Sequence, residues 1–226
     1  MNLKSNEVTF RPTPYWESIF LPAWFVAMAL AAYFAAGRND HTYALFCSQL
    51  TGLIVLLFSM PRGDTRRPLW GSLTTLGLWH FRWVGFASVA ILYILGSVYR
   101  RFFGVPIEPF LHEISQLSGV LHWAEILFTT LIVAPIAEEL LFRGLLFGVL
   151  RRQNTKLSTC LAIFGSAIVF MGTHWQYQQG STLISLFILA LLLGIARTAS
   201  NGLLLPILMH VEAAALAYVL EVFPAR

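Results

Sequence analysis

The stretch VLHWAEILFTTLIVAPIAEELLFRGLLFGVL, residues 120–150, is almost entirely apolar, yet three ionisable residues lie close together in it, Glu138, Glu139 and Arg143. A helix needs about 20 apolar residues to cross the roughly 30 Å of hydrocarbon in a bilayer. The stretch therefore predicts a transmembrane helix that is longer than one straight crossing requires. We expect it to be steeply tilted, to extend beyond the bilayer, or to be broken near Pro135, which removes one helical hydrogen bond.

The same apolar pattern recurs along the chain. Of the 226 residues, 57% are hydrophobic and 12% are charged, against roughly 25% charged in an average soluble domain, and the mean hydropathy is +0.69. We predict an all-α, multi-pass transmembrane helical bundle with about seven spans, at 18–37, 42–60, 82–99, 120–150, 158–175, 180–196 and 202–222. An N-terminal segment (1–17) precedes a first group of spans and loops (18–119) and a helical core (120–222).

The basic residues predict how the bundle is oriented. In a soluble protein the net charge of +4 and the pI of 9.3 would suggest a nucleic-acid partner, but here Lys and Arg lie in short links between apolar segments. With residues 1–17 in the cytoplasm, ten of the fifteen fall on the cytoplasmic side, as the positive-inside rule favours: Lys4, Arg11, Arg62, Arg66, Arg67, Arg82, Arg151, Arg152, Lys156 and Arg197. We expect a multi-pass protein of the cell membrane with no nucleic-acid partner.

The two cysteines, Cys47 and Cys160, fall in predicted spans and toward opposite membrane faces in this orientation. Such a separation far exceeds the roughly 7 Å between Cα atoms that a disulfide tolerates. We expect two free and buried thiols.

The link at 100–119 is the longest between the predicted spans. Its apolar residues recur at helical spacing, at Ile107, Phe110, Leu111, Ile114 and Leu117. This spacing favours an amphipathic helix that lies in the membrane interface.

Ionisable residues inside a membrane are candidates for function, because each costs at least ~2.5–3.5 kcal/mol on insertion scales. Glu139 and Arg143 are four positions apart and can pair on one helix face. Glu138 is rotated by about 100° and projects from a neighbouring face. One interpretation is a buried structural ion pair with Glu138 reaching another helix, although a buried pair is weak evidence of stabilisation and Glu138 still needs a partner.

Two later segments each bring a histidine into the membrane. Phe170 lies one turn before His174, and His210 follows Pro206 in the last span, with Glu212 close by. A single such histidine is more often a satisfied core residue than a catalyst. At 1.5 Å per residue, the depths from the cytoplasmic ends are roughly 20 Å for Glu138, 24 Å for His174 and 12–14 Å for His210. These depths are compatible with one site.

One glutamate and two histidines in a sequestered pocket support two hydrolytic routes. In the first, Glu138 acts as general base on a water held by His174, and His210 stabilises charge on the attacked carbonyl oxygen. In the second, the same groups hold a divalent metal that activates the water. Neither His-Glu-x-x-His nor Gly-x-Ser-x-Gly occurs, so the motifs of helical zinc proteases and of serine hydrolases are absent.

The ordered motifs resemble those of the ABI or CPBP intramembrane proteases, a family that includes the type II CAAX prenyl endopeptidases. They are Glu-Glu-x-x-x-Arg at 138–143, Phe-x-x-x-His at 170–174, and His210 after Leu-Gly-Ile-Ala-Arg at 193–197. The resemblance covers about residues 120–222, which would then form the catalytic core.

The resemblance also implies roles for single residues. Glu138 would activate water, Glu139 and Arg143 would organise it, His174 would help to hold the water, and His210 would contribute to an oxyanion site. The glutamate-dependent chemistry of the family needs no bound metal, so we expect no metal and no other cofactor.

Position 214 departs from the pattern of the family, whose last motif commonly runs His-x-x-x-Asn. Ala214 has no side-chain hydrogen-bond donor, and loss of an oxyanion donor costs ~10²–10³ in rate where one is used. Three alternatives follow: His210 suffices, Glu212 or Asn201 substitutes, or the chain is a divergent or inactive member.

The sequence thus predicts a glutamic-type intramembrane endopeptidase of a bacterial inner membrane that cleaves a membrane-anchored protein or peptide near its carboxyl end. The resemblance implies three substrate types: prenylated CAAX tails, bacteriocin-like peptides, and carboxy-terminal sorting signals, as in the myxosortase-like branch. A sorting or maturation protease is the version that we favour. The alternative is a non-enzymatic membrane protein, either a proton-coupled transporter or an immunity protein that binds a peptide toxin without cutting it.

Overall fold

The computed structural model describes residues 22–24, 26–30, 47–54 and 83–225, and no strand occurs in these ranges. The prediction of an all-α fold is confirmed for them. Residues 22–24, 26–30 and 47–54 are helical, and from residue 83 onward the α-helices are α4 (Trp83–Phe102), α5 (Pro109–Ser115), α6 (Val120–Phe128), α7 (Ala134–Glu139), α8 (Phe147–Leu150), α9 (Lys156–Thr173), α10 (Gly180–Ser200) and α11 (Leu204–Ala217). Shorter pieces are the π-helical turns Thr129–Val133, Leu140–Leu146 and Tyr218–Val222 and the 3₁₀ turn Phe223–Ala225.

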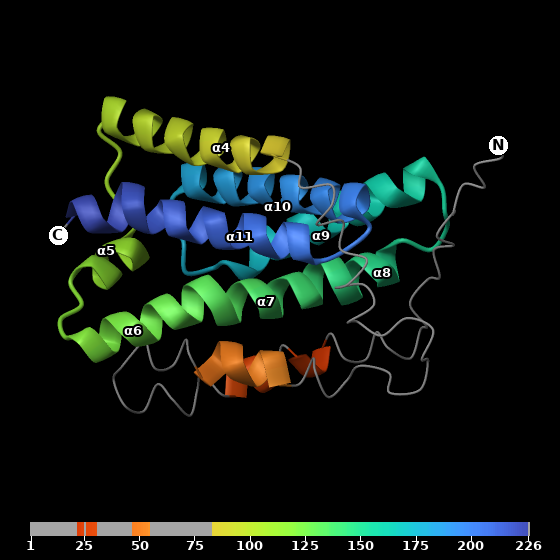
Figure 1. Ribbon diagram of the computed structural model, residues 1–226, viewed down its shortest axis with the longest axis horizontal. Coiled ribbons are helices and arrows are strands. Elements are labelled where there is room, and N and C mark those ends of the chain that lie inside the picture. The colour runs from red at the N-terminus through yellow and green to blue at the C-terminus, as the bar shows by residue number, and fades with distance from the viewer. Residues whose placement is uncertain (1–21, 25, 31–46, 55–82, 226) are drawn as a thin grey trace.

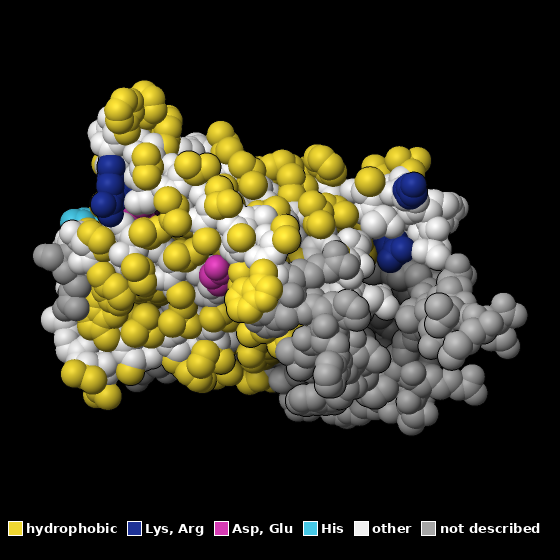
Figure 2. Space-filling view, turned by 45° about the horizontal axis from the view of Figure 1, so that its top comes forward, with side chains coloured by type: hydrophobic (Ala, Val, Ile, Leu, Met, Phe, Trp, Pro, Cys, Tyr) yellow, Lys and Arg dark blue, Asp and Glu magenta, His cyan; other side chains and the backbone are white. Residues whose placement is uncertain are grey.

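Within the described ranges, five helices are long and apolar enough to cross a membrane: Trp83–Phe102, Val120–Leu150, Lys156–Thr173, Gly180–Ser200 and Leu204–Ala225. They match the last five predicted spans to within a few residues at each end. The first two predicted spans, 18–37 and 42–60, lie mostly outside the described residues. Figure 2 shows hydrophobic side chains over the middle of one face and Lys and Arg toward its two ends, as a membrane-spanning protein requires. The protein is therefore a multi-pass membrane protein.

The long helix Val120–Leu150 is continuous over 31 residues, so Pro135 does not break it. Instead, π-helical turns lie on both sides of α7, which has the proline in its first turn. A π turn widens the hydrogen-bond ladder, and such local adjustment allows a transmembrane helix to accommodate the proline ring and the missing N–H. The remaining alternatives for this helix are tilting and extension beyond the bilayer.

The helices pack side by side in one bundle (Figure 1). In this view α10 and α11 run between α4 and the long helix, and the helical residues 22–24, 26–30 and 47–54 lie on the other side of the long helix. A Cβ atom on Gly194 of α10 would lie 3.1 Å from Ile163 Cγ2 of α9, so glycine allows these two helices to approach closely. One cluster of buried apolar side chains surrounds the middle of the long helix and includes Leu141, Phe142, Phe170, Ala190 and Leu203.

The link at 100–119 is helical only in part, beyond the end of α4, over Pro109–Ser115. Its apolar side chains pack against the rest of the protein. Ile114 is buried and packs with Tyr218 and Val222, and Phe110 and Leu111 pack against the same cluster. The link therefore joins the core of the protein.

Both cysteines are free, as predicted. The prediction that they are buried is wrong, because Cys160 is exposed on α9 and Cys47 is half-buried. An apolar helix in a membrane has a side that faces lipid, and hydropathy alone does not separate that side from the protein core.

Candidate active site

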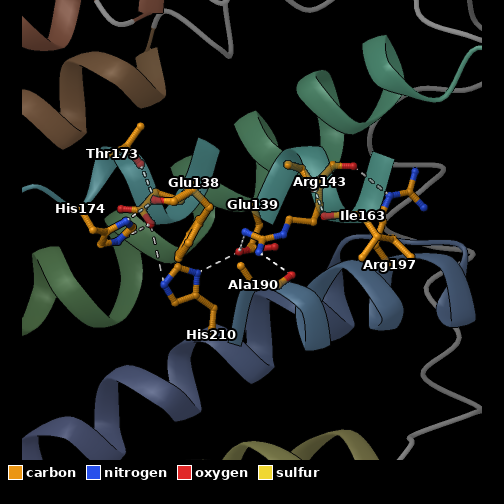
Figure 3. Close-up of polar contacts among 11 residues, drawn as sticks. Glu138, Glu139, Arg143, Ile163, Thr173, His174, Ala190, Arg197 and His210 are labelled. Atoms are coloured by element: carbon orange, nitrogen blue, oxygen red, sulfur yellow. Dashed lines mark hydrogen bonds and ion pairs between the residues drawn. The ribbon is translucent and has the colours of Figure 1, made fainter. Parts of the chain in front are cut away.

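Glu138 on α7 is buried and is surrounded by groups from three other parts of the chain (Figure 3). The Nε2 atoms of His174, at the end of α9, and of His210, on α11, lie 3.7 and 3.8 Å from Glu138 Oε2. The side-chain amide of Gln49 donates a hydrogen bond to the other carboxylate oxygen, Oε1, at 3.1 Å. The structure thus brings together the glutamate and the two histidines that were singled out in separate segments of the sequence.

In each imidazole, the ring nitrogen that faces away from Glu138 is Nδ1. This nitrogen carries the hydrogen of the neutral ring, because it lies beside a hydrogen-bond acceptor. His174 Nδ1 lies 2.7 Å from the carbonyl oxygen of Phe170, which can only accept, so this nitrogen donates. His210 Nδ1 lies 2.9 Å from Glu139 Oε1 and donates to that carboxylate. In the neutral rings, both Nε2 atoms therefore carry lone pairs that point toward Glu138.

Glu139 and Arg143 form the predicted ion pair, and both side chains are completely buried. Arg143 Nη1 donates to Glu139 Oε1 at 2.8 Å, and Nη2 donates to the carbonyl oxygen of Ala190 at 3.1 Å. The guanidinium carbon also lies 4.6 Å from the centre of the Phe170 ring. Because Glu139 Oε1 accepts hydrogen bonds from both Arg143 and His210, the ion pair holds His210 in place.

Phe170 connects the two histidines. Its ring centre lies 4.4 Å from that of His174 and 5.7 Å from that of His210, and the side chain is completely buried. The spacing Phe-x-x-x-His therefore serves twice, since the phenylalanine supplies a ring that packs on both imidazoles and a carbonyl that orients one of them.

His174 lies just beyond α9, which ends at Thr173, and not inside a helix as the predicted span 158–175 implied. In a continuing helix its backbone N–H would bond to the carbonyl of Phe170. That carbonyl accepts the imidazole hydrogen instead, and the backbone N–H of His174 donates to Met171 at 3.1 Å. The side chain thus competes with the helix and ends it.

Tyr177 lies in the loop between α9 and α10, and its ring stacks on the imidazole of His174 with centres 6.0 Å apart and planes 13° apart. Burial raises the pKa of Tyr177 above its ordinary value. The hydroxyl therefore stays protonated and adds no negative charge beside His174.

Gln49 is the site residue that sequence reasoning missed. It is 7% exposed, and the signal that selected Glu138, a polar residue in an apolar segment, also applies to it. Glu212 and Asn201, the suggested substitutes for an asparagine at position 214, have no contact with Glu138 among the described hydrogen bonds and ion pairs. The amide beside Glu138 comes from Gln49.

Glutamate and histidine are ligand types that hold zinc in catalytic sites. Among the described residues, however, no group of three or more His, Cys, Asp or Glu side chains has the arrangement of a metal site. The geometry on its own therefore does not define a metal centre at Glu138.

Comparison with known proteins gives two matches. Residues 120–216 match the family described as type II CAAX prenyl endopeptidase Rce1-like. An uncharacterized 24.3 kDa protein of Escherichia coli is 30% identical over 208 residues, which is 88% of this chain and 92% of that protein. No solved structure matches the chain. The chain therefore belongs to one family with this Escherichia coli protein, and its residues 120–216, which contain the predicted motifs, match the type II CAAX prenyl endopeptidase Rce1-like family.

Proposed function

We propose that this protein is a glutamic-type intramembrane endopeptidase that hydrolyses a peptide bond near the carboxyl end of a membrane-anchored protein or peptide. One observation carries the proposal. Glu138 Oε2 is buried, has no hydrogen-bond partner among the described residues, and lies 3.7 and 3.8 Å from two imidazole nitrogens. These distances are too long for direct hydrogen bonds, but a water between these atoms can donate hydrogen bonds of about 2.8 Å to Glu138 Oε2 and to one of the two nitrogens.

The reaction needs a base, and Glu138 supplies it. Glu138 Oε2 takes a proton from the water while the water oxygen bonds to the carbonyl carbon of the peptide. The Nε2 lone pair of His174 accepts the second hydrogen of the water and orients it. The carboxylic acid of Glu138 then returns the proton to the amide nitrogen as the C–N bond breaks. The products are a new carboxylic acid and a new amine, and the acid then ionises by releasing its proton to the amine or to water.

His210 can stabilise the oxyanion only when its ring is protonated. Its Nδ1 hydrogen is held by Glu139, so its Nε2 can donate to the oxyanion of the tetrahedral intermediate only when the ring is an imidazolium. The carboxylate of Glu139 stabilises that positive charge, as the carboxylate does in a Ser-His-Asp triad. Arg143 keeps the carboxylate in position through its 2.8 Å hydrogen bond.

The substrate must reach a site that lies within the bundle of membrane-spanning helices. A peptide that is already anchored in the bilayer meets this requirement, and the family is named for endopeptidases that act on CAAX prenyl proteins. For this chain we favour a sorting or maturation protease of a bacterial inner membrane, with the bilayer and an anchored protein or peptide as partners.

A cleavage assay tests the proposal. The protein is reconstituted in vesicles with three peptides: a prenylated CAAX tail, a bacteriocin-like peptide, and a carboxy-terminal sorting signal with an apolar span and a basic tail. Mass spectrometry of the products should show one class cut at one bond, and His174→Ala should lose most of the rate. Activity should persist after exhaustive chelation, whereas a loss that one added metal restores would favour the metal route. Failure to cut any of the three peptides counts against the proposal.

The hydrogen bond from Gln49 to Glu138 predicts the effect of a substitution at Gln49 on the rate of cleavage. Gln49→Leu keeps the side-chain volume but removes a hydrogen bond to a charged group, which is worth about 1.5–3 kcal/mol. That energy corresponds to a loss of roughly 10- to 100-fold in kcat/KM. The matched control is Ser48→Ala, at the neighbouring buried position. Equal rates for Gln49→Leu and the wild type would show that the amide does not serve the reaction.

A further inference from the structure

Glu108 is a buried carboxylate that the proposed reaction does not use. It is 3% exposed and lies directly before α5. Its two oxygens accept hydrogen bonds from successive backbone N–H groups directly before α10: Oε1 from Gln179 at 2.8 Å and Oε2 from Gln178 at 3.1 Å. The side-chain amide of Gln179 donates in turn to the carbonyl oxygen of Pro106 at 2.7 Å. These three hydrogen bonds fix residues 178–179.

The loop that Glu108 fixes is the one that follows His174. Only residues 175–177 separate His174 from the anchored residue Gln178, and the backbone N–H of Tyr177 donates to the carbonyl oxygen of His174 at 3.1 Å. The Tyr177 ring stacks on the imidazole of His174, and Phe110 of α5 packs edge-on against Tyr177 with ring centres 5.7 Å apart. The segment that carries Glu108 therefore contacts the loop at two points.

His174 depends on such contacts because it lies outside the helix. A single backbone hydrogen bond, from its N–H to the carbonyl oxygen of Met171, joins it to the end of α9, and its side chain has one described hydrogen bond, to Phe170. The direction of Nε2 toward Glu138 therefore depends on the side-chain hydrogen bond and on the rings of Phe170 and Tyr177, which pack on the imidazole.

We propose that Glu108 is a positioning residue for His174, which acts by holding the loop 175–179 through the two backbone N–H groups before α10. Its effect on rate rests on the proposed function, whereas its effect on the orientation of the imidazole does not. A displacement of about 1 Å from reactive geometry can cost roughly 10²-fold in rate. We therefore expect Glu108→Gln to lower kcat by up to about that factor and to change KM little.

The orientation of His174 is measured by nuclear magnetic resonance of protein labelled with ¹⁵N-histidine, with the His174 signal identified by its absence from His174→Gln. The glutamine of Glu108→Gln has nearly the same volume as glutamate. Its NH₂ group would face one of the two backbone N–H donors and cannot accept a hydrogen bond from it. We expect the His174 signal to split or broaden in Glu108→Gln. Glu113→Gln, at an exposed position of α5, should leave the signal unchanged.

The outcomes separate this inference from the proposed function. An unchanged His174 signal in folded Glu108→Gln overturns the inference, whatever the activity. A wild-type protein that cuts no peptide contradicts the proposed function, and the His174 signal still decides the role of Glu108. If thermal unfolding shows that Glu108→Gln is not folded, Gln179→Ala takes its place, because it removes only the hydrogen bond to Pro106. Its His174 signal should broaden to a smaller extent, and an unchanged signal there also overturns the inference.

Discussion

We expect the Glu138→Gln variant to lose peptide hydrolysis, with kcat reduced by about 10²–10⁴-fold, the range that a general base contributes. The substitution keeps the shape of the side chain and an oxygen that can accept from Gln49. It removes the oxygen that takes the proton from water. Because the amide still occupies the same space, KM should change little. Both constants are measured with the peptide that the wild type cuts best.

Glu125→Gln is the matched control, since Glu125 lies on the same long helix and outside the described contacts of the site. It should retain the wild-type rate, and the two variants should unfold at similar temperatures. Cleavage by Glu138→Gln at the wild-type rate contradicts the assignment of the base. Proton-dependent uptake into proteoliposomes that is lost in Glu138→Gln, without any cleavage by the wild type, favours the transporter alternative.

The Arg143→Met variant should lose the most stability, about 3–5 kcal/mol in the free energy of unfolding, as expected when one partner of a buried ion pair is removed. Glu139 would remain as a completely buried carboxylate without its guanidinium. The variant also loses the hydrogen bond to Ala190 and the contact with the Phe170 ring. Chemical denaturation in detergent measures the change.

A second variant shows whether the loss comes from the unpaired charge. Glu139→Gln/Arg143→Met removes both charges, and replacement of a whole buried pair is often close to neutral for stability. We expect the double variant to recover much of the stability and to remain almost inactive, because His210 has lost the carboxylate that stabilises its charge. A double variant that is no more stable than Arg143→Met would show that the two charges are not coupled.

The sequence singles out side chains that the structure brings together, because a membrane penalises unpaired polar groups and few of them occur in the spans. This penalty selects Glu138, Glu139, Arg143, His174 and His210 from an otherwise apolar chain, and the structure places these five side chains together. The i,i+4 pairing of Glu139 with Arg143 follows from helix geometry alone.

Other features depend on tertiary contacts that no local pattern encodes. The end of α9 depends on competition between an imidazole and a backbone N–H for one carbonyl. The contact of Gln49 with Glu138 joins residues 89 positions apart. Glu108 is equally difficult to predict, because a carboxylate in a link between spans is usually solvated and here bonds to the backbone of another loop.

The two π turns of the long helix change how its two halves face the rest of the bundle. A π turn contains more residues than an α turn, so each one alters the angular phase between the side chains before and after it. The half before Pro135 directs Ile126 toward Tyr218 and Val222, while the half after it directs Glu139 and Arg143 toward His210 and Ala190. His210, Tyr218 and Val222 all lie on the helix Leu204–Ala225, so both halves of the long helix face this one helix. At about 100° per residue, the 13 positions from Ile126 to Glu139 would turn their side chains about 220° apart, and the π turn Thr129–Val133 between them changes this angle. A substitution that converts the π turn Thr129–Val133 to regular α-helix would therefore rotate the carboxylates relative to α6 and away from this shared partner.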